Sequence, residues 1–164
     1  MSQSTRFAWR VESEDHEETR TESTRLPVIR NGDPALGRAL IGSLSGAIEA
    51  RRPLTHHHRE VAAGLRQHLT ERRADVMGRT REVLPRLEAH HRALARAFSS
   101  FRERAAAIED SISLAVATGS GLGELERAVI LRMLQQMWDD LEKVEGVALD
   151  LALEESWNDL GGEG

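Results

Sequence analysis

The hydrophobic positions between Leu84 and Ala115 repeat every seven residues. Each member of one row is followed three residues later by a member of a second row, and most other positions are polar or alanine. The two rows are Leu84, His91, Phe98, Ala105 and Ile112, and Leu87, Leu94, Phe101, Ile108 and Ala115. This spacing predicts one long helix whose seam must be buried against other helices. We expect this helix to organise the rest of the fold.

A shorter helix is predicted before it, over residues 34–52. Asp33 can cap the helix, and Pro34 suits its first position. Its apolar stripe consists of Leu36, Leu40, Ile41, Leu44 and Ile48. Glycines at positions 37, 42 and 46 lie near one edge of this stripe. Because a glycine costs about 1 kcal/mol relative to alanine in a helix, we expect a close helix crossing at this edge.

A second helix is predicted after Pro53, with Thr55 as its cap. Its apolar line consists of Val61, Leu65, Leu69, Val76 and Val83. This line is thin, and Arg72, Arg73 and Arg79 interrupt it. We therefore expect this helix at the periphery of the fold, with one edge in water.

The joint near residues 77–85 allows two arrangements. Met77 and Gly78 could end the second helix, with Pro85 in the first turns of the next one, so that the chain folds back. Alternatively, one helix of about 90 Å, at 1.5 Å per residue, runs through the joint and is kinked at Pro85. The fold-back is favoured, because a rod would leave apolar surface exposed unless two chains paired.

A last helix is predicted over residues 122–158, after a break at residues 118–123 that is rich in glycine and serine. It carries two apolar lines, where most helices carry one. The lines are Ile130, Leu134, Met137, Leu141, Val144, Ala148 and Leu151, and Val129, Met133, Trp138, Leu149, Leu153 and Trp157. A helix that is apolar on two sides needs more than one neighbour. The elements together predict an all-α fold: a four-helix, mainly antiparallel bundle with long coiled-coil-like helices and an extended N-terminal arm.

The N-terminal region differs in composition from the predicted helices, because it is polar and acidic. The expected regions are a polar arm over residues 1–32, a helical bundle domain over residues 33–160 and a tail over residues 161–164. The arm contains two short apolar pieces, Phe7–Val11 and Leu26–Ile29, and Pro27 favours an extended backbone in the second. The two pieces could pair as a hairpin. The arm with Trp9 and the acidic last helix are the candidate partner contacts.

The charges are segregated along the chain. The formal net charge is −5, but residues 51–104 carry a balance of +7 and residues 105–164 a balance of −10. We expect the basic helices to pack beside the acidic last helix, within one chain or between chains. The alternative is a basic surface over residues 51–104 that faces nucleic acid. The sequence has no cysteine, which excludes thiol chemistry and fits a reducing compartment.

Histidine and glutamate side chains are the candidates for a metal site. Residues His56–His58 point about 100° apart on a helix, so they cannot all bind one ion. Glu88 and His91 have the spacing that puts two ligands on one face, but di-iron bundles use two such motifs with further carboxylates. Here Glu60 or a symmetric dimer would have to complete the set. Because His91 belongs to the buried seam, we expect it to set register instead.

The remaining motifs have ordinary structural explanations. The glycine cluster at residues 119–123 resembles part of a dinucleotide loop but follows a helix, so a linker is expected. Aromatic and sulfur side chains that could line a ligand pocket are expected in the core, with Trp138 the exception to consider. They are Phe98, Phe101, Met133, Met137 and Trp138. His68 and His90 are expected at the surface. No catalytic, cofactor-binding or metal-binding residue is predicted.

We therefore expect a non-catalytic helical subunit for protein–protein interaction or assembly, an adaptor or scaffold that self-associates or binds a larger partner. The alternatives are a ferritin-like metal-binding bundle and a small nucleic-acid-associated subunit. The start of the chain lacks the pattern of a signal peptide. The longest uncharged apolar run, residues 39–48, is about half the roughly 20 residues that a membrane span needs. We expect a soluble, cytoplasmic protein without a membrane partner.

Overall fold

The chain is helical throughout the part that the structure describes. The computed structural model describes residues 33–79 and 85–161, and over these residues it contains four helices, one 3-10 turn and no strand. The elements are α1 (Pro34–Glu49), α2 (His56–Arg79), η2 (Pro85–Leu87), α3 (Glu88–Thr118) and α4 (Glu124–Gly161). The predicted all-α class is confirmed. The predicted pairing of residues 7–11 with residues 26–29 lies outside the described residues.

The helix ends follow local capping chemistry. The Asp33 side chain accepts a hydrogen bond from the Ala35 backbone N–H at 2.9 Å, and Pro34 occupies the first position of α1. After α1, Arg51 adopts a positive φ of 53°. Gly119 ends α3 with a φ of 64°, a conformation that glycine adopts without a Cβ penalty. The predicted start of α1 and the glycine break after α3 are therefore found at their expected positions, and α2 begins at His56, directly after Thr55.

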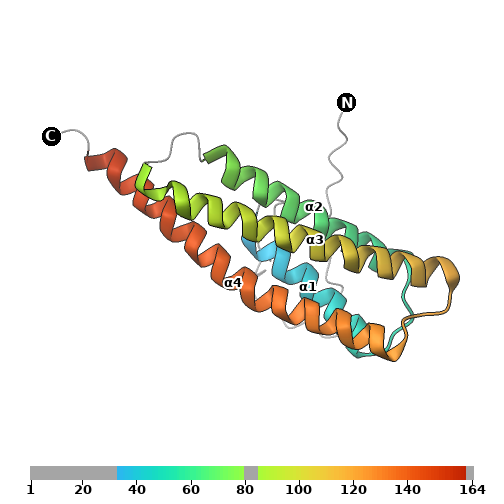
Figure 1. The fold of residues 1–164 in the computed structure, drawn as a ribbon. Helices are drawn as coiled ribbons and strands as arrows, with labels where there is room; N and C mark the ends of the chain where they lie inside the picture. The colour runs from blue at the N-terminus through green and yellow to red at the C-terminus, as the bar shows by residue number, and fades with distance from the viewer. Residues whose placement is uncertain (1–32, 80–84, 162–164) are drawn as a thin grey trace, which may run out of the picture.

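The helices pack around one hydrophobic core to which all four contribute. α2 and α3 lie side by side as the closest pair, so the chain folds back between them and the single kinked rod is excluded (Figure 1). α1 packs against α2 and α4, whereas α3 and α4 touch more sparsely. The molecule is elongated because α2, α3 and α4 are all long.

The predicted seam of α3 lies inside this core. Every described member of its two rows is buried, from Leu87 to Ala115, and Phe98 and Ile112 have no exposed surface. The apolar stripe of α1 is also buried, as are Val61, Leu65, Leu69 and Val76 of α2. Phe98 and Phe101 stack edge to face with ring centroids 6.0 Å apart. These two rings therefore belong to the core, as expected.

α2 is more central than predicted. Arg72, which was expected at a wet edge, is only 8% exposed. His68 was expected at the surface but is 2% exposed, because α1 covers it. The backbone of α1 comes close here: a Cβ built on Gly37 would lie 2.9 Å from Leu141 Cδ2 and 3.1 Å from His68 Nε2. The expected close crossing is therefore found at Gly37, but not at Gly46, where a Cβ would meet nothing within 4 Å.

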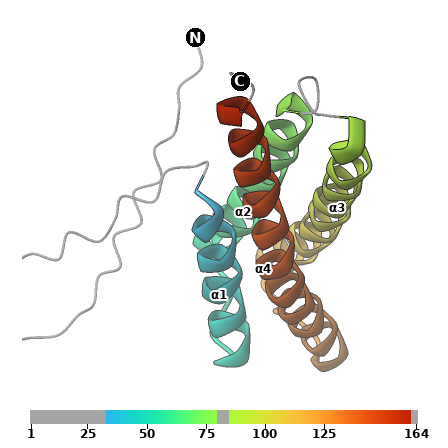
Figure 2. The same ribbon diagram turned by 90° about the vertical axis from the view of Figure 1, so that its left-hand side faces the viewer.

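α1 is much shorter than its neighbours. Viewed along the molecule, α2, α3 and α4 all extend beyond the residue at which α1 begins (Figure 2). At that end of the molecule, only three described helices surround the core. No helix in the described ranges is long and apolar enough to cross a membrane.

Candidate functional site

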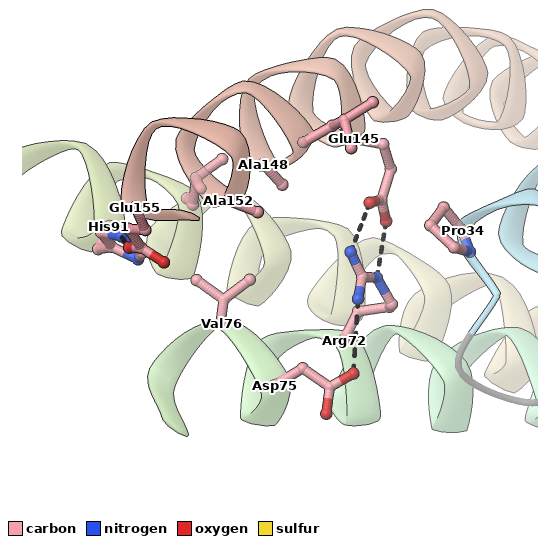
Figure 3. Close-up of a pocket in the computed structure, with 11 residues that line it drawn as sticks. Pro34, Arg72, Asp75, Val76, His91, Glu145, Ala148, Ala152 and Glu155 are labelled. Atoms are coloured by element: carbon pink, nitrogen blue, oxygen red, sulfur yellow. Dashed lines mark hydrogen bonds and ion pairs between the residues drawn. The ribbon is translucent and has the colours of Figure 1, made fainter. Parts of the chain in front are cut away.

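A polar cavity of about 250 Å³ lies at the three-helix end of the molecule (Figure 3). Side chains of α2, α3 and α4 form its walls, and Pro34, the first residue of α1, closes one side. The polar lining residues are Arg72, Asp75, His91, Glu145 and Glu155. The rest of the lining is apolar, with Val76, Leu94 and Leu149 among its members. Charged and titratable side chains from α2, α3 and α4 converge in this cavity.

Arg72 joins α2 to α4 across the cavity. Its Nε donates to Glu145 Oε1 at 2.9 Å and its Nη2 to Glu145 Oε2, which forms a forked pair. Nη1 donates to Asp75 at 3.4 Å, and the guanidinium carbon lies 5.6 Å from the centre of the Phe98 ring. The hydrogen bonds to Glu145 raise the pKa of Arg72 above its ordinary value. The guanidinium is therefore held as a structural cation, with each of its three nitrogens donating a hydrogen bond.

His91 joins α3 to α4 at the other end of the cavity. Its Nε2 lies 2.7 Å from Glu155 Oε1, and the His91 side chain is only 5% exposed. Its Nδ1 is buried, and no described residue offers it a hydrogen bond. The pair fixes one position of α3 against one position of α4, which agrees with the register role expected of a polar residue in the seam.

The charged side chains that line the cavity contact one another. Glu145 and Asp75 accept hydrogen bonds from Arg72, and Glu155 contacts His91. Among the described residues, no group of three histidine, aspartate or glutamate side chains is placed to hold a metal ion.

The residues considered for a metal site are dispersed. Glu88 is on the surface and pairs with Arg92, whereas His91 faces inward toward Glu155. Glu60 pairs with His56 on the same helix, at 3.2 Å. His58 accepts hydrogen bonds at Nδ1 from the Thr55 backbone N–H and can share another with the Thr55 hydroxyl, both at 3.0 Å. The structure therefore places these side chains in separate local contacts.

The basic region pairs with the acidic helix inside one chain, as one of the two charge interpretations predicts. Its arginines contact α4 at both ends of the molecule, since Arg51 binds Glu124 and Arg86 binds Glu154. Arg104 lies 3.8 Å from Asp140. The Arg51 guanidinium beside Glu124 lowers the pKa of that carboxyl through its hydrogen bonds. Many of the segregated charges therefore form ion pairs between neighbouring parts of the same chain.

A second hollow separates α3 from α4 near the glycine linker. This groove has a volume of about 630 Å³ and a mainly apolar lining. It is lined by Ala107, Ile108, Ser111, Gly123, Glu124, Leu125, Glu126, Val129, Ile130 and Met133. Small residues at positions 107, 111 and 123 leave the space open, in agreement with the sparse contact between the two helices.

The second apolar line of α4 is largely uncovered. Met133 and Trp138 are partly buried against the core. The other members are exposed: Val129 by 50%, Leu149 by 62%, Leu153 by 51% and Trp157 by 76%. Over the described residues, the expectation that neighbours cover both sides of this helix is therefore not met along the second line. The first line is covered, with Leu134, Met137 and Leu141 buried.

The sequence pattern did not reveal the polar cavity. Arg72 and Glu145 are 73 residues apart, and no local spacing connects them. The opposite charges of the two regions were the one available signal, and they indicated the kind of contact but not the residues. Comparison of the chain with models of known protein families, with curated proteins and with solved structures gives no match.

Proposed function

We propose that this protein is a non-catalytic assembly subunit that self-associates through the groove between α3 and α4. In this proposal the four helices form a mainly antiparallel bundle with coiled-coil-like long helices, which serves as a rigid support for the groove. The observation that carries the proposal is the cluster of exposed apolar side chains around the groove. Leu125 and Val129 line the groove and are 80% and 50% exposed. Leu114 of α3, three residues after the lining residue Ser111, is 63% exposed.

Exposed apolar side chains gathered beside a hollow are typical of interaction surfaces, whereas scattered ones need no explanation. The cluster lies on α4 and α3 at the same end of the molecule, next to the linker at residues 119–123. Each fully buried leucine or valine side chain contributes about 1.5–3 kcal/mol. Covering Leu114, Leu125 and Val129 would therefore offset a useful part of the entropy lost on association.

The patch has the shape that a two-fold interface requires. In such an interface, the same surface of both subunits must be complementary to itself. Leu125 projects from the rim of the groove, and the groove beside it has room for an inserted leucine. A second copy could place its Leu125 in this groove and receive Leu125 of the first copy in return. We therefore name a second copy of the chain as the occupant.

The double variant Leu125→Glu with Val129→Glu tests this proposal. Ala128→Glu is the matched control, because Ala128 is exposed on the same helix but does not line the groove. We expect the wild-type chain and the control to self-associate. The double variant should associate at least tenfold more weakly, since a tenfold change corresponds to about 1.4 kcal/mol. Solution mass across a concentration series gives the dissociation constants.

The outcomes separate the proposal from its competitors. A wild-type chain that stays monomeric at every concentration and binds no co-purifying protein contradicts the assembly role. A monomer that co-purifies with a larger protein through the same two side chains contradicts self-association but keeps the interaction role. We propose the cytoplasm as the location, because a chain without cysteine fits a reducing compartment. The metal alternative has less in its favour, because no described side chains are grouped to hold an ion. The nucleic-acid alternative has less in its favour because Arg51, Arg66 and Arg72 are paired with acidic side chains.

A further inference from the structure

A second apolar surface lies at the opposite end of α4. Leu149, Leu153 and Trp157 are spaced four residues apart, so they form one stripe along the helix. All three are more than half exposed, at 62%, 51% and 76%. Leu149 also lines the polar cavity, so the stripe and the cavity form one continuous surface. We call this surface the C-terminal docking surface.

The C-terminal docking surface is exposed because α1 is short. Pro34 lines the cavity together with Glu145 and Leu149, so α1 begins at this level of α4. α4 continues from there to Gly161, beyond the reach of α1 (Figure 2). No described residue covers the stripe. Pro34, to which the preceding chain is attached, therefore lies beside the cavity.

We propose that Leu26–Ile29 of the same chain occupies the C-terminal docking surface. Ile29 is five residues before Pro34, and an extended chain spans at most about 3.3–3.6 Å per residue, so it can lie about 17 Å from Pro34. The stripe from Leu149 to Trp157 is about 12 Å long at 1.5 Å per residue. The segment is therefore tethered within reach of the whole stripe.

The chemistry of the segment matches the surface. Leu26, Val28 and Ile29 supply three apolar side chains for three exposed apolar side chains of α4. Arg25 and Arg30 flank the segment on both sides.

The charges of the cavity complement those two arginines. The cavity lining contains three carboxylates, those of Asp75, Glu145 and Glu155, against the single guanidinium of Arg72. Asp150 adds an exposed carboxylate beside the stripe. A tethered segment also needs little affinity to stay bound, because its effective concentration is high.

This inference is independent of the groove between α3 and α4. Leu125 and Leu149 are about 36 Å apart along α4, at 1.5 Å per residue. A segment docked at the C-terminal docking surface leaves the groove free, so either proposal can fail while the other holds. Solution mass tests the groove, and an intrachain contact tests the docking.

Disulfide cross-linking in the full chain tests the docking, because the sequence contains no other cysteine. The test variant carries Val28→Cys with Leu153→Cys. The matched control carries Val28→Cys with Val147→Cys, since Val147 is 44% exposed, about 9 Å from Leu153 along α4 at 1.5 Å per residue, and on a different side of the helix. Both pairs have a similar tether, so they differ mainly in whether docking brings the two sulfurs together.

We expect the 28–153 pair to cross-link at least tenfold faster than the 28–147 pair under mild oxidation, within one chain. Adding Leu26→Ser and Ile29→Ser to the test variant should reduce its rate to that of the control, because the apolar contacts are lost. Equal rates for the two pairs would overturn the inference. Cross-linked dimers in place of intrachain products would overturn it too, because a second copy would then occupy the surface.

Discussion

Arg72 shows how a charged side chain can be held between three helices. Its guanidinium makes two hydrogen bonds with Glu145 and lies over the Phe98 ring, and the two charged side chains are only 10% and 11% exposed. Desolvating such a pair is costly, so the pair adds little net stability. Removing one partner is strongly destabilising, because the other charge is then left buried and unpaired.

We predict that Arg72→Leu lowers the free energy of unfolding by about 3 kcal/mol, because Glu145 loses its partner in a nearly buried position. The double variant Arg72→Leu with Glu145→Leu should recover most of this loss, since no charge is stranded. Urea unfolding of the two variants and Glu145→Leu completes the double-mutant cycle. Additive effects in this cycle would show that the two side chains do not interact.

His58 makes the start of α2 sensitive to acid. The folded protein lowers the pKa of His58 below 6.5, through burial first and then through the charges of His57 and Arg52. Its neutral Nδ1 accepts the hydrogen bond from the Thr55 backbone. Because the folded pKa is below the unfolded one, this contribution is fully present above about pH 6.5. It is lost as the pH falls from 6.5 through the lowered pKa.

We predict that His58→Gln reduces the acid loss of stability in that range, since the amide oxygen can accept the same bond and does not titrate. The effect should be no larger than the roughly 1 kcal/mol of a helix-capping contact. The measurement is the melting temperature from pH 7.5 to pH 5 for wild type, His58→Gln and the exposed His90→Gln. An identical pH dependence for wild type and His58→Gln would rule out this role.

At the scale of the elements, α1 combines a tight contact with an open one. A Cβ on Gly37 would press against Leu141 and His68, whereas a Cβ on Gly46 would meet open space. Both glycines are inside the same helix, so they carry the same intrinsic cost of about 1 kcal/mol relative to alanine. The difference between them is therefore packing alone.

We predict opposite effects for the two alanine variants of α1. Gly46→Ala should stabilise the protein by up to about 1 kcal/mol, or roughly 2–4 °C in melting temperature. Gly37→Ala should destabilise it by about 1–3 kcal/mol, because overpacking exceeds the gain in helix propensity. Thermal unfolding of both variants decides the matter. A stabilising Gly37→Ala would mean that α1 does not approach its neighbours closely.

The sequence pattern predicted where the helices lie in the chain better than it predicted which helices pack together. The seam of α3 was predictable residue by residue, because a seven-residue repeat specifies which face of a helix is buried. The burial of Arg72 on α2 was not predictable, because the apolar line of this helix is thin and Arg72 pairs with Glu145, far along the chain. The close contact of Gly37 with Leu141 and His68 depends on distant parts of the chain in the same way. Patterns within one helix cannot contain this information.

At the scale of the whole molecule, the described helices leave two apolar surfaces uncovered on α4. A second apolar line does predict contacts, but it does not say whether they come from the same chain or another. The structure separates the line into the groove near Val129 and the stripe at Leu149, Leu153 and Trp157. The sequence indicated a site of association on α4. It could not indicate that this site is divided into two surfaces, because the division depends on the short length of α1 and on the groove between α3 and α4.

The accessibility of position 129 as a function of protein concentration tests the central claim most directly. Single-cysteine variants Val129→Cys and Ala128→Cys can be labelled with a thiol reagent, since the chain has no other cysteine. We predict that labelling at position 129 slows as the concentration rises and recovers on dilution, while labelling at position 128 keeps a constant rate. Equal and concentration-independent rates at the two positions would contradict the assignment of this groove as the self-association surface.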